Sequence, residues 1–168
     1  MSGIVNQTGA RSGIIGTTVG TPAGGAGDVQ KNSWHLFAST TTNAYDGSNG
    51  ILDFDFNVFI GSNVSESAGE ITVTDAGLYL CSFCITNYGA SVNDHDWNYR
   101  INDTMVNGTH TYQSILSSTT VPYITLTSVA VLRMSASDTV HIYGNGYYRG
   151  DSTDSQTFCT GVRVGDLS

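Results

Sequence analysis

Charged residues are scarce in this sequence, at 12% of 168 residues, and lysine occurs once, as Lys31. The six basic residues are scattered along the chain, so no cluster of positive charge is present to neutralise the phosphates of a nucleic acid. A net charge of −8 makes anionic membranes equally poor partners. The sequence therefore predicts a protein that binds neither nucleic acid nor membrane.

Long apolar runs are also lacking. No run approaches the length that spans a membrane as a helix, and residues 1–6 have neither the basic region nor the apolar stretch of a signal peptide. We therefore expect a chain that is made and folded in a cytoplasm and leaves it, if at all, by another route.

Cysteine is limited to three residues, an odd number that does not build a framework of disulfides. Cys81 and Cys84 have the spacing of a metal-binding pair, but residues three apart in a strand face opposite sides and cannot hold one ion together. We expect buried, reduced thiols at both positions and at Cys159.

Glycine, threonine, serine and asparagine take the place of the missing charges, whereas leucine, alanine, glutamate and lysine are sparse. The first group is typical of strands and turns, and the second of helices. The composition predicts an all-β protein without a convincing helix, and 168 residues are enough for one domain with a full core.

Residues 1–31 differ from the rest of the chain, because they hold eight of the twenty glycines and no aromatic residue. Ordering so much glycine costs backbone entropy that the few apolar residues here do not offset. We expect an extended N-terminal arm at 1–31 and a folded domain at 32–168. The candidates for contacts between the arm and a partner are Ile4, Val5, Arg11, Ile14 and Ile15.

The stretch 70–85 organises the predicted domain. Ile71 and Val73 alternate with threonines, as in a half-buried strand, and Asp75-Ala76-Gly77 supplies residues typical of a turn. Residues 78–85 form the most apolar run in the chain. Its length and its β-branched and aromatic residues favour a strand that is buried on both faces.

Apolar segments recur at spacings of eight to twelve residues, which indicates about nine or ten short strands of a sandwich or barrel. Asn107-Gly108 is a strong hairpin signal, and Asn102-Asp103 is also expected to turn the chain. Residues 87–96, rich in Asn, Asp and Gly, are predicted to form an exposed loop. Residues 121–134 fit either one bent strand or two.

Four motifs occur in an order that is shared by a known family. They are the strand entry Gly77-Leu78-Tyr79, the hairpin signal Asn107-Gly108, the segment 132–142 after an apolar strand, and the final strand with Phe158-Cys159-Thr160-Gly161-Val162. Over residues 34–164 they resemble the globular head of complement's first component and its tumour-necrosis-factor-like relatives. The resemblance implies a jelly-roll β-sandwich of about ten antiparallel strands that assembles as a homotrimer.

The same resemblance assigns structural positions to Gly77, Tyr79, Asp138, Phe158 and Gly161. The family usually places Gly-Asp before its penultimate strand, and this chain has Ser137-Asp138 there instead.

Residues 2–17 read Ser-Gly-Ile-Val-Asn-Gln-Thr-Gly-Ala-Arg-Ser-Gly-Ile-Ile-Gly-Thr. This stretch is similar to the opening of structural proteins encoded by aquatic tailed phages. The similarity implies a protein of the virion that is made in the host cytoplasm and released by lysis. Its partners would be the major capsid protein or other virion proteins.

Asp94-His95-Asp96 is the cluster that most resembles a catalytic site, but a single histidine without a further ligand is more typical of a solvated loop. Loop carboxylates at Asp94, Asp96, Asp151 and Asp154 have the oxygen chemistry of a calcium site, without the spacing of an EF-hand. The sequence contains neither a Gly-x-Ser-x-Gly elbow nor a phosphate-binding loop. We expect no enzyme, no metal and no cofactor.

Four ring-bearing residues are candidates for contacts between subunits: Tyr79, Phe83, His141 and Tyr143. Tyr79 and Phe83 share a strand face that either lines a trimer axis or fills the interior of one subunit. His141 alternates with the apolar Val140 and Ile142 and is expected at the surface or in an interface.

The leading functional hypothesis is a capsid decoration, or cement, protein. It would sit on the shell as a homotrimer whose arms lie across neighbouring subunits and clamp them. A fibre tip or adhesin that recognises a host surface ligand is the alternative. A soluble trimeric recognition module from a bacterium is a third reading.

Overall fold

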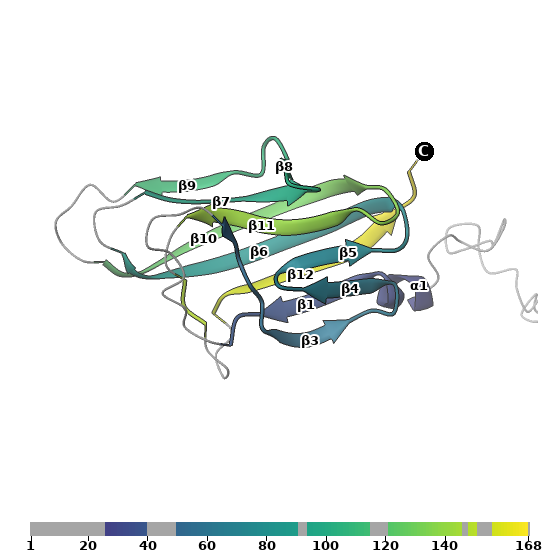
Figure 1. Cartoon of the computed structure of the whole chain (residues 1–168), viewed down its shortest axis with the longest axis horizontal. Coiled ribbons are helices and arrows are strands. Elements are labelled where there is room, and N and C mark those ends of the chain that lie inside the picture. Colours follow the sequence, from purple (N-terminus) through teal and green to yellow (C-terminus); the bar gives the residue numbers. More distant parts are fainter. Residues whose placement is uncertain are drawn as a thin grey trace, which may run out of the picture.

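The structure is a computed structural model in which residues 26–39, 50–90, 94–114, 121–145, 148–150 and 156–167 are described. The described chain forms two antiparallel sheets that stack face to face, with one short helix beside them (Figure 1). The prediction of an all-β jelly-roll sandwich is confirmed. Within the described residues, no helix is long and apolar enough to cross a membrane.

Sheet A contains five strands in the order β10-β6-β12-β1-β3. They are β1 (Ser33–Phe37), β3 (Phe56–Ile60), β6 (Gly77–Ala90), β10 (Val121–Met134) and β12 (Phe158–Gly165). β6 and β10 pair along their whole length, so residues 121–134 form one strand. The last strand in the sequence, β12, lies in the middle of the sheet between β1 and β6.

Sheet B contains seven strands, with β4-β5-β11-β7-β8 in order and β2 and β9 beside them. They are β2 (Gly50–Ile51), β4 (Val64–Ser67), β5 (Glu70–Val73), β7 (Asp94–Ile101), β8 (Thr104–Met105), β9 (Thr111–Ser114) and β11 (Thr139–Asn145). β5 and β2 share one edge of β11, whose other edge pairs with β7. β8 and β9 share the far edge of β7.

The alternation in residues 51–56 is typical of one strand, but the structure divides this segment between the sheets. β2 belongs to sheet B and β3 to sheet A, and the chain crosses between them. In the crossing segment Leu52 and Phe54 are buried, whereas Asp53 and Asp55 are exposed. Extended backbone alternates its side chains whether or not it pairs, so the pattern marks a connection that is buried on one side.

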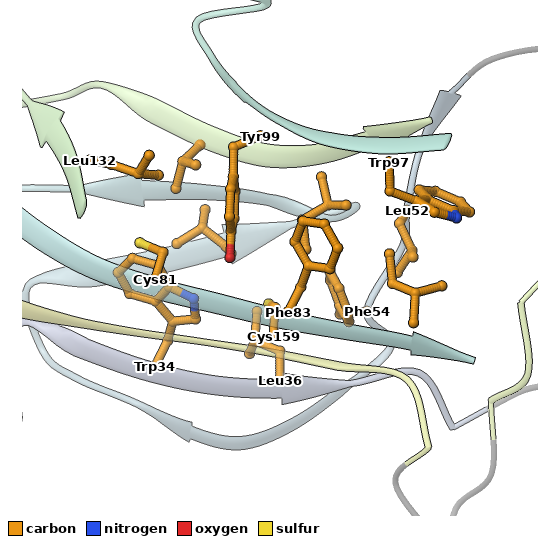
Figure 2. Close-up of a cluster of buried hydrophobic side chains, with 14 of the residues drawn as sticks. Trp34, Leu36, Leu52, Phe54, Cys81, Phe83, Trp97, Tyr99, Leu132 and Cys159 are labelled. Atoms are coloured by element: carbon orange, nitrogen blue, oxygen red, sulfur yellow. The ribbon is translucent and has the colours of Figure 1, made fainter. Parts of the chain in front are cut away.

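The hydrophobic core fills the space between the two sheets (Figure 2). Phe83 of β6 and Tyr99 of β7 come from opposite sheets, and their ring centroids lie 5.1 Å apart. Within sheet A, the rings of Trp34 and Tyr79 lie 5.9 Å apart. Aromatic packing of this kind stabilises the contact between the layers beyond the burial of area alone.

Residues 87–96 do not form the exposed loop that their polar composition predicts. β6 and β7 extend into this segment from both sides. Asn87 is fully buried, and its amide accepts a hydrogen bond from the Trp97 indole nitrogen (3.3 Å) and donates one to the Ile124 carbonyl (3.4 Å). An asparagine whose amide is paired at both ends is compatible with the interior of a strand.

The hairpin expected at Asn107-Gly108 is wrong, because the two strands beside this turn do not pair with each other. The turn at Asn102-Asp103 joins β7 to β8, and both of its residues are left-handed, with φ of 48° and 64°. This is the geometry that suits the twist of two paired strands. Asn107-Gly108 is also a turn, with φ of 81° at Gly108, but the segments beside it, β8 and β9, both pair with β7.

A six-residue helix, α1 (Ala26–Lys31), lies in the segment that the sequence predicts as extended. The Asn63 amide donates a hydrogen bond to the Lys31 carbonyl (3.0 Å) and so ties the end of α1 to the sandwich. Gly61 allows this close approach, because a β-carbon there would lie 2.2 Å from the Lys31 oxygen. Residues 1–25, the remainder of the predicted arm, lie outside the described residues.

Candidate subunit interface

Sheet A leaves one face free of sheet B. Along β6, Tyr79, Cys81 and Phe83 point into the core, and the residues between them point outward. Because residues opposite one another in a ladder share a face, the pairing extends this outer face across all five strands. Its residues include Thr127, Val129 and Val131 of β10; Leu80, Ser82 and Cys84 of β6; Phe158, Thr160 and Val162 of β12; His35 and Phe37 of β1; and Phe56 of β3.

An apolar row crosses this face. Val131 lies opposite Leu80, and Leu80 lies opposite Val162. Val131 is 60% exposed and Leu80 is 40% exposed, and Val129 on the same face of β10 is 70% exposed. Apolar side chains that are contiguous and remain in water are typical of a surface that another protein covers.

Aromatic rings extend this patch toward β3. Cys84 lies opposite Phe158, Phe158 opposite Phe37, and Phe37 opposite Phe56. The rings of Phe37 and Phe56 stack with their centroids 4.5 Å apart, and Phe56 remains 47% exposed. Aromatic residues are enriched in the centres of protein interfaces.

Three hydroxyl side chains on the outer face of sheet A, those of Ser82, Thr86 and Thr160, have partners inside the chain. The hydroxyls of Ser82 and Thr160, which lie opposite each other, are 2.7 Å apart. The Thr86 hydroxyl donates a hydrogen bond to the Gln156 carbonyl (3.1 Å). Removing water from a hydroxyl that keeps its hydrogen-bond partner costs little free energy, so this face is suited to burial.

Formal charge is nearly absent from the patch. Among the described outward-facing residues of sheet A, Arg133 carries the one formal charge, and it lies next to the end of β10. Covering the centre of the face therefore removes little charge from water.

Tyr79 and Phe83, two of the predicted interface residues, fill the interior of the subunit. Tyr79 is fully buried and Phe83 is 1% exposed. The Tyr79 hydroxyl donates a hydrogen bond to the Asp75 carbonyl (2.7 Å), and burial raises the pKa of Tyr79 to about 12. Of the two placements that the sequence leaves open, the structure has the interior one, and neither side chain keeps surface for another copy.

His141 and Tyr143 lie on the outer face of sheet B, because Val140 and Ile142 of β11 point into the core. The expectation of a surface position is wrong for His141, whose side chain is fully buried by its neighbours on that face. Tyr143 is partly exposed, and the Arg100 guanidinium lies 3.4 Å from the centre of its ring. Neither residue reaches the outer face of sheet A.

Asp94-His95-Asp96 begins β7 and is not a solvated loop. His95 is buried, and the Asp96 carboxylate lies 3.8 Å from the exposed ring of His110. Asp151 and Asp154, with which Asp94 and Asp96 would share a calcium ion, lie outside the described residues. The arm candidates Ile4, Val5, Arg11, Ile14 and Ile15 also lie outside them.

The three cysteines are free thiols on the strands of sheet A, as predicted, but the expected burial is wrong for Cys84. Cys81 and Cys84 occupy opposite faces of β6, with Cys81 buried and Cys84 partly exposed on the outer face. Burial raises the pKa of Cys81 to about 12 and holds that of Cys159 well above its ordinary value. Burial also raises the pKa of Cys84.

Sequence reasoning missed Leu80, Val129 and Val131 as interface candidates. The signal is present, because β6 and β10 carry apolar side chains on both faces while only one face of each meets sheet B. A strand that is apolar on both faces needs cover on both. The sequence does not show which protein surface covers the second face of these strands.

The two stacked antiparallel sheets form a jelly-roll β-sandwich, and a solved structure shares this fold. The solved crystal structure of murine APRIL at pH 8.5 is similar, with a TM-score of 0.60 and 14% sequence identity, and the match covers 79% of this chain and 98% of that one. A likeness at this identity concerns the fold alone. No protein-family model matches the chain, and no curated protein matches it in sequence.

Proposed function

We propose that this chain is a structural protein of a tailed-phage particle, a homotrimer that decorates the capsid shell and clamps it through residues 1–31. The observation that carries the proposal is the apolar outer face of sheet A, centred on Leu80 and Val131, which a single copy leaves in water. Packing copies against each other through this face removes the patch from water and stabilises the assembly.

The jelly roll supports three as the number of copies, since the family that the sequence resembles assembles in threes. Closed three-fold symmetry also limits growth, because each copy uses the same contact with its neighbour and no unpaired face remains. Three arms would then project from each trimer, so that the weak contacts of the arms with the shell would add through effective concentration.

The base of each arm is held by the sandwich, which supports a clamping role. α1 ends at Lys31, whose carbonyl accepts a hydrogen bond from Asn63, and the Arg163 amide donates one to the neighbouring Asn32 carbonyl (3.0 Å). A tether fixed at its base transmits load from the shell to the folded domain. The resemblance of residues 2–17 to phage structural proteins is the reason to place that shell in a virion.

Native mass spectrometry of the full chain and of two matched variants tests the assembly. Val131→Asp introduces a carboxylate into the patch, and Met105→Asp makes the same change at a residue of sheet B that is 48% exposed. We expect the full chain and the Met105 variant to be trimers and the Val131 variant to be a folded monomer. A monomeric full chain, or a trimeric Val131 variant, would contradict the proposed interface.

Removal of residues 1–25 tests the clamp, because this cut leaves α1 and its contacts with the sandwich intact. We expect the truncated chain to remain a trimer and to lose binding to capsids. Normal decoration by the truncated trimer would overturn the clamp. If the isolated domain instead blocks adsorption of the phage to its host, the chain is a receptor-binding fibre tip.

A further inference from the structure

Three side chains from separate segments meet on the outer face of sheet B. His141 comes from β11, Glu70 from the first position of β5, and Asp103 from the turn between β7 and β8. His141 Nδ1 lies 3.9 Å from the Glu70 Oε1, and His141 Nε2 lies 3.7 Å from the Asp103 Oδ1. One ring nitrogen and one oxygen from each carboxylate all lie within 4.8 Å of one another.

The histidine in this group is buried without a hydrogen bond. The His141 side chain has no exposed surface, and neither of its ring nitrogens has a hydrogen-bond partner. A buried polar group in this state destabilises the fold unless something occupies it. Burial lowers the pKa of His141 in spite of the two carboxylates, so the ring favours the neutral form that can donate a lone pair.

The two carboxylates are held at the site by their backbones and remain accessible. The Asn102 amide donates a hydrogen bond to the Asp138 carboxylate (2.7 Å), and its oxygen accepts one from the Thr139 amide (3.0 Å). These bonds fix the turn that carries Asp103, whose side chain is 83% exposed, while that of Glu70 is 44% exposed. Both side chains are therefore free to shift toward a ligand.

The remaining charge near the ring belongs to Arg100, which lies opposite His141 on β7. Its guanidinium lies over the ring of Tyr143, 3.4 Å from the ring centre, where a cation–π contact holds it. Besides burial, Arg100 helps to lower the pKa of His141. Among the contacts of the described residues, no arginine or lysine is paired with the Glu70 or the Asp103 carboxylate. The two carboxylates beside His141 supply the negative charge that attracts a cation.

We propose that Glu70, Asp103 and His141 bind a divalent transition-metal ion of the Zn²⁺ class. One imidazole nitrogen and two carboxylate oxygens suit such an ion better than Mg²⁺ or Ca²⁺, which prefer oxygen ligands alone. Ligands that lie about 2.0–2.2 Å from a tetrahedral Zn²⁺ ion are about 3.3–3.6 Å from one another. The three ligand atoms lie within 4.8 Å of one another, so they need to close by about 1.5 Å at most. The ion would join β5, β11 and the turn between β7 and β8, on the face of sheet B that lies opposite the proposed subunit interface.

The binding is tested with ZnCl₂ by isothermal titration calorimetry on the full chain at neutral pH. Cys84→Ser serves as the background, because that thiol is partly exposed and would bind zinc on its own. The test variants are Glu70→Gln and Asp103→Asn. Asp103 has a φ of 64°, and asparagine tolerates this left-handed conformation, so the second variant keeps the turn. His110→Gln is the matched control, since His110 is an exposed histidine beside a single carboxylate, that of Asp96.

We expect one zinc ion per chain, no measurable binding of Mg²⁺, and a loss of affinity of about tenfold or more in each test variant. The His110 variant should bind as the background chain does. Zinc should also raise the melting temperature of the background chain and not that of the Asp103 variant. Equal zinc affinity in the Asp103 and background chains, or no binding to the background chain, would overturn the site. Trimer formation by the same samples is read separately, so this result does not depend on the proposed function.

Discussion

Gly161 of β12 lies against the indole of Trp34 on β1, and a β-carbon on Gly161 would lie 2.0 Å from the Trp34 Cζ2 atom. The two residues are directly opposite in the ladder, so the large ring occupies the space that the glycine leaves. The position that the family resemblance marks as structural thus has a physical reason, which is room for a tryptophan in the core.

Gly161→Ala should therefore destabilise the fold. The added methyl group meets a buried ring that cannot move away, and overpacking of this kind costs about 1–3 kcal/mol. Urea unfolding measures the change. Gly165→Ala is the control, because a β-carbon there would meet its nearest neighbour, a Leu78 carbon, at 3.8 Å, which is an ordinary contact. Equal stability of the two variants would contradict this reading of the Trp34 site.

The cysteines report on the outer face of sheet A. Burial and a raised pKa protect Cys81 and Cys159 from thiol reagents, whereas Cys84 lies within the patch that a neighbouring copy would cover. We expect iodoacetamide to label Cys84 in the monomeric Val131→Asp chain and to leave it unlabelled in the trimer. Peptide mapping by mass spectrometry shows the site of labelling. Equal labelling of Cys84 in both chains would place the subunit contact elsewhere.

Asp75 should make stability depend on pH at the acid end. Hydrogen bonds from Asn32 and from Asn63 (2.7 Å) lower the pKa of this carboxyl below its ordinary value of 3.8, with a smaller contribution from the positive charge of Arg163. The folded chain thus favours the ionised form, which stabilises it above pH 3.8, and this contribution is lost as the pH falls through the lower pKa of the folded state.

Asp75→Asn should accordingly reduce stability at neutral pH and flatten the fall in unfolding free energy on acidification. Urea unfolding at a series of pH values gives both quantities. Asp53→Asn changes an exposed aspartate and is the control. If the Asp75 variant keeps the full acid dependence of the parent, other carboxylates account for it.

Gly61 should control how firmly α1 is attached. A β-carbon there would collide with the Lys31 carbonyl at 2.2 Å, and that carbonyl accepts the hydrogen bond that ties α1 to the sandwich. Lys31 is the one lysine in the chain, so cleavage by endoproteinase Lys-C, which cuts after lysine alone, measures local opening of this junction. We expect Gly61→Ala to destabilise the junction by about 1–3 kcal/mol and so to raise the cleavage rate about fivefold or more. The Gly165→Ala chain should be cleaved at the parental rate.

Much of the sandwich is predictable from the sequence, because alternation and apolar runs report burial directly. The stretch 70–85 contains β5, a turn and the first part of β6, as its pattern predicts. The burial expected on both faces of residues 78–85 is wrong for a single copy of the chain, in which Leu80 is 40% exposed. The expected loop at residues 87–96 is wrong because polar residues there take partners from distant segments. Asn87 reads as a loop residue until Trp97 and Ile124 supply its hydrogen bonds.

The two candidate sites also differ in how far the sequence predicts them. Leu80 and Val131 are visible in the sequence as apolar residues on the second face of strands that already have a core face, although their partner is not. Glu70, Asp103 and His141 carry no shared signal, since they lie in three segments that only the pairing of β5, β7 and β11 brings together. The alternation of His141 with Val140 and Ile142 predicts an exposed side chain, whereas the side chain is buried, so the sequence does not indicate its environment.

The central place of β12 in sheet A also constrains how the chain folds. β1 and β6 are neighbours of β12 and do not pair with each other, so the sheet stays in two pieces until residues 158–165 are available. A nascent chain on the ribosome can pair β6 with β10 once residue 134 has emerged, but it closes the sheet only after nearly all of the chain has been synthesised. Joining residues 33–37 to residues 158–162 is the contact of longest range in the sheet, and we expect it to set the folding rate.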